Sequence, residues 1–220
     1  FTDGRYTLQA ATEVDDKLYE CRHVTDQPLG TWIEENMIID QRLGYDPWLL
    51  TPTQLNRHET SCKKTGVKLT AAEGNLIDTI WTNQPAPPAA TVCTLDDTYT
   101  GETSRSKRQR IAQLVMVEGS DAVVLTAPDS IAWLFNIRGE DVPFTPFALS
   151  FAILFNDGTA YWFIDANKLE TNLTQTLDSN IKLRAPNELA TAIDELGAAK
   201  KSVRIDPTSA AAWIHNRLDQ

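Results

Sequence analysis

An arginine beside a glycine turn is the residue of this chain best suited to binding chemistry. Arg5 lies in Asp3-Gly4-Arg5-Tyr6, at the end of an expected strand. Its planar guanidinium suits bidentate capture of a carboxylate or carbonyl group, and strand ends are where α/β folds place their sites. Arg5 is therefore a candidate binding residue, and the alternative is that it pairs with a neighbouring acid.

A second candidate is the polar segment at residues 136–141, which lies between two very apolar stretches. It contains Arg138, Gly139 and Asp141. Loop segments of this kind serve either structure or function. The sequence leaves both interpretations open.

The histidines give no sign of a catalytic or metal centre. None has another His, Cys or acidic residue three or four positions away in a ligand-like pattern, so we expect surface or structural roles for His23, His58 and His215. HExxH, the phosphate-binding GxxxxGK[ST] loop, GxGxxG and the GxSxG elbow are all absent from the sequence. The residues alone therefore assign neither a catalytic residue nor a metal ligand.

The charge and hydropathy of the chain argue against nucleic acid and membrane as partners. The 220 residues carry a formal net charge of -10, whereas nucleic-acid binding needs clustered Lys and Arg. The one basic run, Arg105–Arg110, is expected to be the solvated face of a helix. No apolar run approaches the roughly 18 residues of a membrane span. Three widely spaced cysteines indicate reduced thiols, so we expect a cytoplasmic protein.

The elements that must position the candidate residues form a module that occurs twice. Each copy begins with an apolar strand end, at residues 1–3 or 163–165, and later has a strand ending in Asp-Pro, at 44–47 or 204–207. The offset of about 160 residues indicates a duplicated domain rather than a repeat array. The second copy alone is preceded by about 60 residues of helix and strand, a typical half-domain. We therefore expect the first domain to be truncated at its start.

A proline-rich stretch predicts where the first domain ends and the second begins. The stretch at 83–90 favours an extended spacer. We expect a first domain at 1–83, a linker and domain entry at 84–100, and a second domain at 101–220. Strands alternate with helices except at one hairpin, which predicts α/β domains, each with a mixed sheet flanked by helices.

Two local signals predict particular elements. Thr51-Pro52 is a helix start, with a hydroxyl cap followed by Pro in the first turn. Asn156-Asp157-Gly158 is expected to be the turn of a hairpin between strands at 147–155 and 161–164.

Taken together, several motifs resemble the non-catalytic part of a three-domain Xaa-Pro aminopeptidase (aminopeptidase P). The resemblance runs over nearly all of the chain in the family's order. The motifs that carry it are FTDGRY with LQA at 1–10, GYDP at 44–47, NLID with IWT at 75–82, and SIAWLFNIRG with DV at 130–142.

The resemblance implies two creatinase-like α/β domains followed by a third domain that is not in this chain. That third domain binds two divalent metal ions, usually manganese, and a metal-activated hydroxide attacks the bond before proline. We therefore expect this chain to be inactive alone and to act on Pro-second peptides only with its own C-terminal catalytic domain. The family resemblance also implies a homodimer.

The resemblance bears on single residues as well. It implies that Arg5 reaches toward the substrate, and that Arg138 and Asp141 lie at an interdomain or substrate-side face. Where the family has His-Asn-Pro after Val-Pro, this chain has Phe144-Thr145-Pro146, so a polar contact there is in doubt.

Two other readings remain. The chain could be a stand-alone creatinase-like module that binds a protein or peptide without catalysis. It could also belong to a prolidase or creatinase, although those have one amino-terminal domain and the duplication disfavours them.

Overall fold

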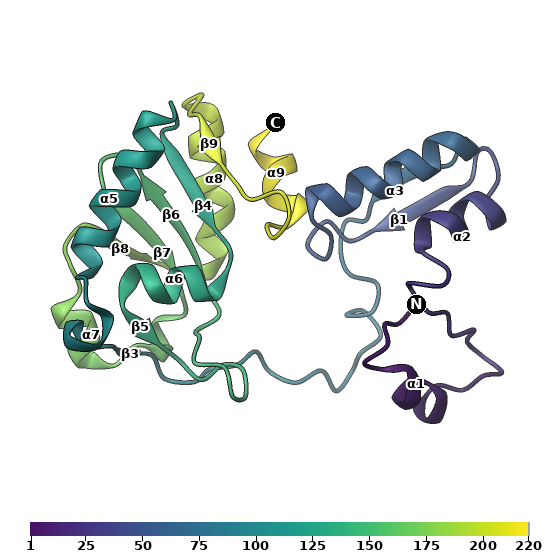
Figure 1. Cartoon of the computed structure of the whole chain (residues 1–220), viewed down its shortest axis with the longest axis horizontal. Coiled ribbons are helices and arrows are strands. Elements are labelled where there is room, and N and C mark those ends of the chain that lie inside the picture. The colour runs from purple at the N-terminus through teal and green to yellow at the C-terminus, as the bar shows by residue number, and fades with distance from the viewer. Residues whose placement is uncertain (220) are drawn as a thin grey trace. The chain divides into compact units, whose positions relative to one another are not determined.

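The computed structural model describes residues 1–219, which form two compact units, one over residues 1–76 and the other over residues 77–219. Figure 1 shows both units in one view. Within the described residues, every helix is too short or too polar to cross a membrane. The first unit, called unit 1 below, carries Arg5, and the second, unit 2, carries Arg138 and Asp141.

Unit 1 is a small α/β unit with a parallel pair of strands. Its elements are α1 (Thr7–Glu13), α2 (Leu29–Asn36), β1 (Arg42–Tyr45), α3 (Pro52–Thr65) and β2 (Lys68–Ala71). Strands β1 and β2 run parallel, and a further parallel bridge joins Thr2 to His23.

The helix start predicted at Thr51 is confirmed, and α3 is closed at both ends. The Thr51 hydroxyl accepts from Gln54 N, and the Gln54 side chain accepts from Thr51 N, which is a capping box. Gly66 ends α3 at φ +75°, a conformation that glycine adopts without strain. The helix packs on a core whose fully buried members are Ile33, Cys62 and Val67.

Unit 2 alternates strands and helices around one larger sheet. Its elements are β3 (Cys93–Thr94), α4 (Asp97–Thr100), α5 (Ser104–Val117), β4 (Ala122–Leu125), α6 (Pro128–Phe135), β5 (Ile137–Arg138), β6 (Phe151–Phe155), β7 (Ala160–Phe163), the 3-10 turn η1 (Ala166–Lys168), α7 (Thr171–Thr176), β8 (Ile181–Arg184), η2 (Pro186–Glu188), α8 (Leu189–Ala198), β9 (Val203–Arg204) and α9 (Ala212–Leu218).

The main sheet of unit 2 is mixed, as the sequence predicts. Its strand order is β8-β7-β6-β4-β9. The inner pairs β4–β6 and β6–β7 are antiparallel, and the outer pairs β7–β8 and β4–β9 are parallel. The short strands β3 and β5 form a separate antiparallel pair.

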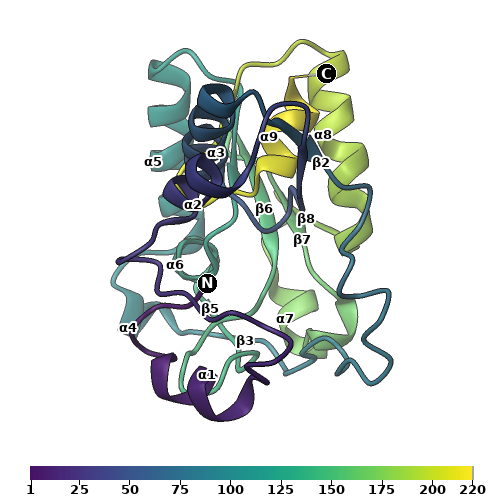
Figure 2. The ribbon, with the colours of Figure 1, turned by 90° about the vertical axis from the view of Figure 1, so that its right-hand side faces the viewer.

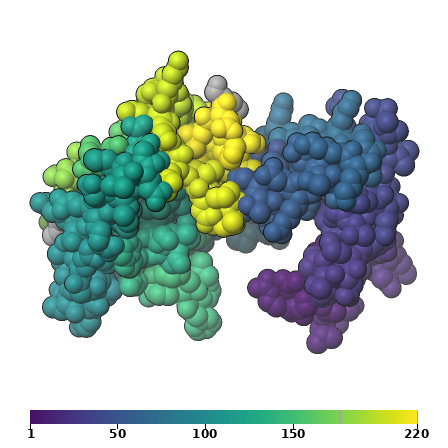
Figure 3. All heavy atoms as spheres, turned by 45° about the horizontal axis from the view of Figure 1, so that its top comes forward, coloured from purple at the N-terminus to yellow at the C-terminus, as the bar shows by residue number. Residues whose placement is uncertain are grey.

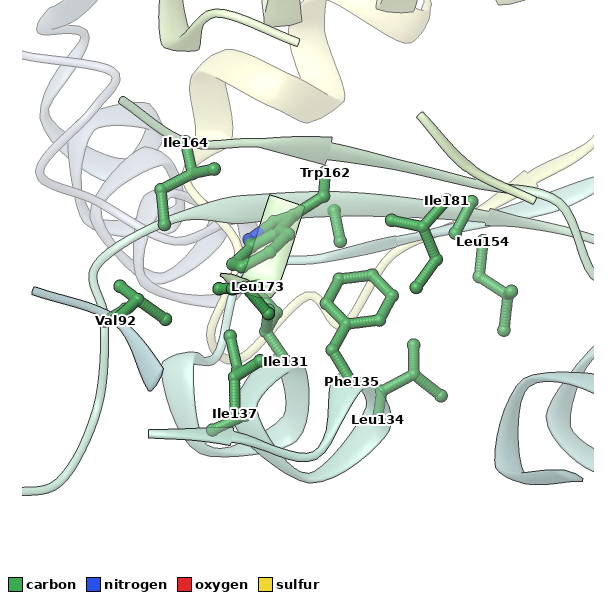
Figure 4. Packing of buried hydrophobic residues seen from close by; sticks show 14 residues of the cluster. Val92, Ile131, Leu134, Phe135, Ile137, Leu154, Trp162, Ile164, Leu173 and Ile181 are labelled. Atoms are coloured by element: carbon green, nitrogen blue, oxygen red, sulfur yellow. The ribbon is translucent and has the colours of Figure 1, made fainter. Parts of the chain in front are cut away.

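Helices cover both faces of this sheet (Figure 1 and Figure 2). The face toward α6 and α7 holds Phe135, Leu173 and Trp162, and Figure 4 shows their side chains converging. The other face packs against α8 and α9 through Ile193 and Ile214. Successive residues of β6 alternate between the two cores, which is the period of a strand buried on both sides.

The predicted hairpin is confirmed, but its first strand is shorter than expected. The turn places Gly158 at φ +86° between β6 and β7. The strand begins at Phe151 rather than Phe147. The reason is that residues 147–149 bond instead to Asp141, whose N–H donates to Phe147 O and whose carboxylate accepts from Leu149 N.

The basic run does not form a fully solvated helix face, and that prediction is wrong for two residues. Lys107 and Arg108 are buried on the inner side of α5. The Lys107 ammonium donates to Asn136 Oδ1 at 2.6 Å, and the Arg108 guanidinium donates to Gly158 O at 2.7 Å and pairs with Asp178 at 2.8 Å. Burial lowers the pKa of both side chains. These cations therefore pin α5 to the sheet.

The repeat expected from the sequence is visible in the turns. Asp3 and Asp165 each accept a hydrogen bond on Oδ1 from the backbone N–H two residues later, at 2.9 Å in both. Asp46 and Asp206 do the same, at 2.8 Å in both. Identical side chains thus close identical turns at corresponding places in the two copies.

The helices and loops between these turns also correspond. Ile33 on α2 and Ile193 on α8 are both completely buried. Before the following strand, each copy has a non-glycine residue with positive φ, Asp40 at 68° and Lys200 at 52°. The duplication therefore extends from turns to core positions.

Candidate functional site

Arg5 lies on the turn between the Thr2 bridge and helix α1. Thr2 is held by hydrogen bonds to Arg22 O and from Val24 N, each 2.9 Å long. Asp3 then closes the turn, because its Oδ1 accepts from Arg5 N and its carbonyl accepts from Tyr6 N at 3.1 Å. An Asp side chain favours such turns because it can accept from the backbone two residues on. Arg5 therefore sits on a defined turn at a strand end.

The Arg5 side chain projects into solvent and is paired with its own turn residue. It is 80% exposed, and the Asp3 side chain is 36% exposed. Arg5 Nε lies 3.1 Å from each carboxylate oxygen of Asp3, and Nη2 lies 2.6 Å from Oδ2. The side-chain hydrogen bonds from Arg5 hold the pKa of Asp3 below its usual value. The neighbouring acid that the sequence left open is thus Asp3, and the guanidinium still faces water.

Asp141 lies inside unit 2, where its side chain is fully buried. Its Oδ2 accepts from Lys168 Nζ at 2.7 Å and from Leu149 N at 2.6 Å, and its Oδ1 accepts from Ala90 N at 3.2 Å. A buried charge is tolerated only when it is paired and hydrogen-bonded. We call Asp141 and Lys168 the buried clamp, because together they tie three distant segments to one point.

The buried clamp also holds the chain that enters unit 2. Lys168 O accepts from Val92 N at 2.7 Å, next to the parallel bridge between Val92 and Leu169.

Arg138, the other candidate of this segment, is half-buried on β5, and its Nη1 donates to Ile137 O at 2.7 Å. The two candidates thus take different partners, and both visible roles are structural.

The turn that follows the buried clamp presents an aromatic ring to solvent. Phe144 is fully exposed and has φ +60°, which is unusual for a bulky residue. At the base of the loop, a Cβ on Gly139 would lie 2.9 Å from Ala148 Cβ, so only glycine fits. Figure 3 shows this part of the chain, in green, projecting from unit 2. The departure Phe144-Thr145-Pro146 therefore lies on an exposed, internally braced turn.

The histidines take separate positions. His23 Nδ1 accepts from Thr25 N at 3.2 Å, and His58 is half-buried, which lowers its pKa. His215 lies 3.0 Å from Asp219, four residues on, and His23 lies 3.8 Å from Asp26, three residues on. The expectation that the histidines lack acidic neighbours at these spacings is therefore wrong for both.

The described residues do not offer a metal site. Across residues 1–219, His, Cys, Asp and Glu nowhere gather in a group of three that could hold a metal ion. The cysteines are free, with Cys62 buried and Cys21 and Cys93 exposed.

Comparison with known proteins places this chain in a family. The model of the creatinase/prolidase N-terminal domain matches residues 83–220, more than half of the chain. The chain belongs to the creatinase/prolidase N-terminal family. The match covers the five-stranded sheet and the buried clamp of unit 2, and the resemblance to Xaa-Pro aminopeptidases stated from the motifs is confirmed.

Sequence similarity to individual relatives also covers part of unit 1. Xaa-Pro aminopeptidase ApepP of Drosophila melanogaster is 33% identical over 82% of the chain and 30% of its own length. A probable Xaa-Pro aminopeptidase P of Tuber melanosporum is 32% identical over 91% of the chain and 33% of its own length. The chain thus spans about a third of the length of these relatives.

A solved structure shows the same fold. X-prolyl aminopeptidase from Caenorhabditis elegans superposes with a TM-score of 0.83 at 27% identity, over 96% of this chain and 36% of that one. It is described as a cytosolic enzyme with a di-nuclear active site. The α/β fold predicted for this creatinase/prolidase N-terminal member is therefore confirmed.

Sequence reasoning missed the partners of the candidate residues. Asp3 was in the quoted motif, and its Asp-Gly turn signal could have suggested that it braces Arg5. Lys168 carried no such signal, because it pairs with Asp141 from 27 residues away.

Proposed function

We propose that this chain is the non-catalytic accessory region of a metal-dependent Xaa-Pro aminopeptidase. Such an enzyme releases the N-terminal residue from peptides with proline in second position. The observation that carries the proposal is that the two Xaa-Pro aminopeptidases described above match 82% and 91% of the chain, while the chain spans about a third of their length. The remaining parts of the enzyme would then supply the chemistry.

In this proposal the chain limits access to the active site and contributes oligomer contacts. Binding energy and orientation come from these residues, and bond cleavage comes from the C-terminal catalytic domain. The two metal ions, which we propose to be manganese, lie in that domain. The enzyme would act in the cytoplasm as a homodimer.

Arg5 is the proposed substrate-facing residue. Its guanidinium is exposed on a fixed turn, which suits a donor that reaches out of one domain toward a bound peptide. Arg138 and Asp141 are proposed to lie at an interdomain or substrate-side face. Asp141 would serve that face indirectly, since it bonds to residues 147 and 149 after the turn that presents Phe144.

The first test is peptide hydrolysis by the isolated chain with added manganese. We expect no release of the N-terminal residue from a Pro-second peptide, whereas a full-length Xaa-Pro aminopeptidase in the same buffer does release it. Turnover by the pure chain would sink the proposal.

The second test is Arg5→Ala in the longer protein that contains this chain. Loss of a charge-assisted hydrogen bond should lower kcat/KM about tenfold, with the metal content unchanged. Asn167→Ala, at the corresponding turn position of the second copy, is the matched control and should behave as wild type. Wild-type kinetics for Arg5→Ala would remove Arg5 from the site.

A stand-alone interaction module is the second candidate. The observation in its favour is Phe144, a fully exposed aromatic ring on a braced turn, because exposed aromatic residues are enriched in protein interfaces. This candidate would be preferred if a longer protein containing the chain failed to hydrolyse Pro-second peptides in the presence of manganese.

A further inference from the structure

The carboxylate of Asp3 does two things at the turn that carries Arg5. One is to accept the hydrogen bond from Arg5 N at 2.9 Å, which closes the turn. The other is to hold the guanidinium through Nε, 3.1 Å from both oxygens, and through Nη2, 2.6 Å from Oδ2. Both contacts fix the direction in which Arg5 points.

The contact uses one edge of the guanidinium and leaves the other edge free. An arginine side chain has five N–H donors in a planar fork. Asp3 engages the side formed by Nε and Nη2. The end-on edge, formed by Nη1 and the second N–H of Nη2, remains for another acceptor. Two parallel donors in a plane match a carboxylate or a pair of peptide oxygens.

The second copy of the module shows that the turn does not require this ion pair. Asp165 accepts from Asn167 N at 2.9 Å, and its carbonyl accepts from Lys168 N at 3.0 Å, just as Asp3 does with Arg5 and Tyr6. The second copy has Asn167 where the first has Arg5. The Asp3–Arg5 pair is therefore an addition to a turn that forms without it.

Two titratable groups, Asp3 and Tyr6, interact with Arg5, and a third, His23, acts on Asp3. Besides Asp3, the Tyr6 ring centre lies 5.6 Å from the guanidinium carbon. His23 lies on the neighbouring bridge strand, where its Nε2 is 3.6 Å from the place a Cβ of Gly4 would occupy. His23 Nδ1 accepts from Thr25 N at 3.2 Å and lies 3.8 Å from Asp26 Oδ2.

We propose that Asp3 is a positioning residue, which holds Arg5 side-on so that its end-on edge binds an oxygen of a peptide ligand. The inference rests on the proposed substrate-facing role of Arg5. It adds the residue that orients Arg5 and the chemical class of the acceptor, a carboxylate or a peptide carbonyl.

The test is an NMR titration of the 220-residue chain with the tripeptide Ala-Pro-Ala, following the side-chain Nε–H signal of Arg5. Asp3→Asn is the informative variant, because the Asn oxygen still accepts from Arg5 N while the charge is lost. We expect it to weaken binding about threefold, the size typical of an exposed ion pair, and to speed exchange of the Nε proton. Asp165→Asn is the matched control and should change neither quantity.

The pH profile adds a readout that a purely structural role would not move. Arg5 lowers the pKa of Asp3, so the orienting charge is present above the ordinary Asp pKa and is lost as the pH falls through the lowered one. Wild-type affinity for the C-terminally amidated tripeptide, which does not titrate in this range, should fall there, and that of Asp3→Asn should stay flat. Comparing free and amidated tripeptide at neutral pH tells whether a carboxylate or a carbonyl is bound.

The outcomes separate the two proposals. If the Arg5 signal shifts with peptide but Asp3→Asn binds and exchanges as wild type does, the positioning role is overturned and the substrate-facing role of Arg5 stands. If the wild-type Arg5 signal does not respond to tens of millimolar peptide, the positioning role is overturned, whereas the substrate-facing role of Arg5 is decided by the kinetics of Arg5→Ala in the longer protein.

Discussion

The two copies of the duplicated module use the same turns with very different amounts of buried surface. In unit 2, Phe163 is buried in a five-stranded sheet, and the core on its side has nine buried members among the described residues. In unit 1 the core has three buried members among the residues that the structure describes. The comparison shows that the hydrogen bonds from these Asp side chains to the backbone form whether the core beside the turn is large or small.

The turns also carry different side chains. After Asp165 the second copy places Lys168, whose ammonium turns inward to Asp141 and forms the buried clamp. After Asp3 the first copy places Arg5 and Tyr6, which remain exposed. One scaffold therefore serves as an internal anchor in unit 2 and as a presented donor in unit 1.

The largest expected effect comes from breaking the buried clamp. Asp141→Ala leaves the Lys168 ammonium buried without its partner, which costs about 3–5 kcal/mol of unfolding free energy. The measurement is urea unfolding followed by tryptophan fluorescence. Tyr6→Ala, at the position corresponding to Lys168 in the first copy, should stay within about 0.5 kcal/mol of wild type.

A double substitution provides the control for this loss. Asp141→Leu with Lys168→Met removes both charges together and should recover part of the stability that Asp141→Ala loses, because no lone charge stays buried. If Asp141→Ala alone costs less than about 1 kcal/mol, the clamp is hydrated in solution and the contrast between the two turns disappears.

The next largest effect is the loss of unfolding free energy when either of two corresponding buried isoleucines is truncated to alanine. Ile193→Ala should cost about 4 kcal/mol and Ile33→Ala about 2 kcal/mol, within the range for such truncations. Ile193 is packed between α8 and the sheet, whereas the neighbours of Ile33 are mostly only partly buried and can close around the gap. Hydrogen exchange of α8 and α2 amides would report each unit separately. Equal losses would mean that the smaller core is packed as tightly as the larger one.

Structural features that depend on only a few consecutive residues could be predicted from the sequence. Thr51 and Gln54 form a capping box three residues apart, and Gly158 supplies the positive φ that the hairpin turn needs. The repeat was visible because its turns depend on single Asp residues such as Asp46 and Asp206. Each of these signals acts within one turn of chain, so no knowledge of the core was required.

Features that depend on distant partners could not be predicted. Lys107 and Arg108 look like the rest of a solvated basic run, but their acceptors Asn136 and Gly158 lie 29 and 50 residues away. Only the packing of α5 on the sheet places those acceptors within reach of the two cations. The same reasoning applies to the candidate site, since the motif pointed to Arg5 while the partners of Asp141 come from three separate segments.

The smallest expected effect tests the loop that precedes β1 in one copy and β9 in the other. Lys200 ends α8 in a left-handed conformation, and Lys201 N donates to Leu196 O at 3.0 Å, an arrangement in which glycine is favoured. Lys200→Gly should therefore raise stability by about 1 kcal/mol.

Asp40, the corresponding residue of unit 1, has φ +68°, but aspartate tolerates this conformation better than lysine does. Asp40→Gly should consequently gain less than Lys200→Gly, by about half a kcal/mol or more. Thermal unfolding of the two variants against wild type measures the difference. A larger gain at Asp40 would mean that backbone strain, like burial, is distributed unequally between the copies, with the greater share in the smaller unit.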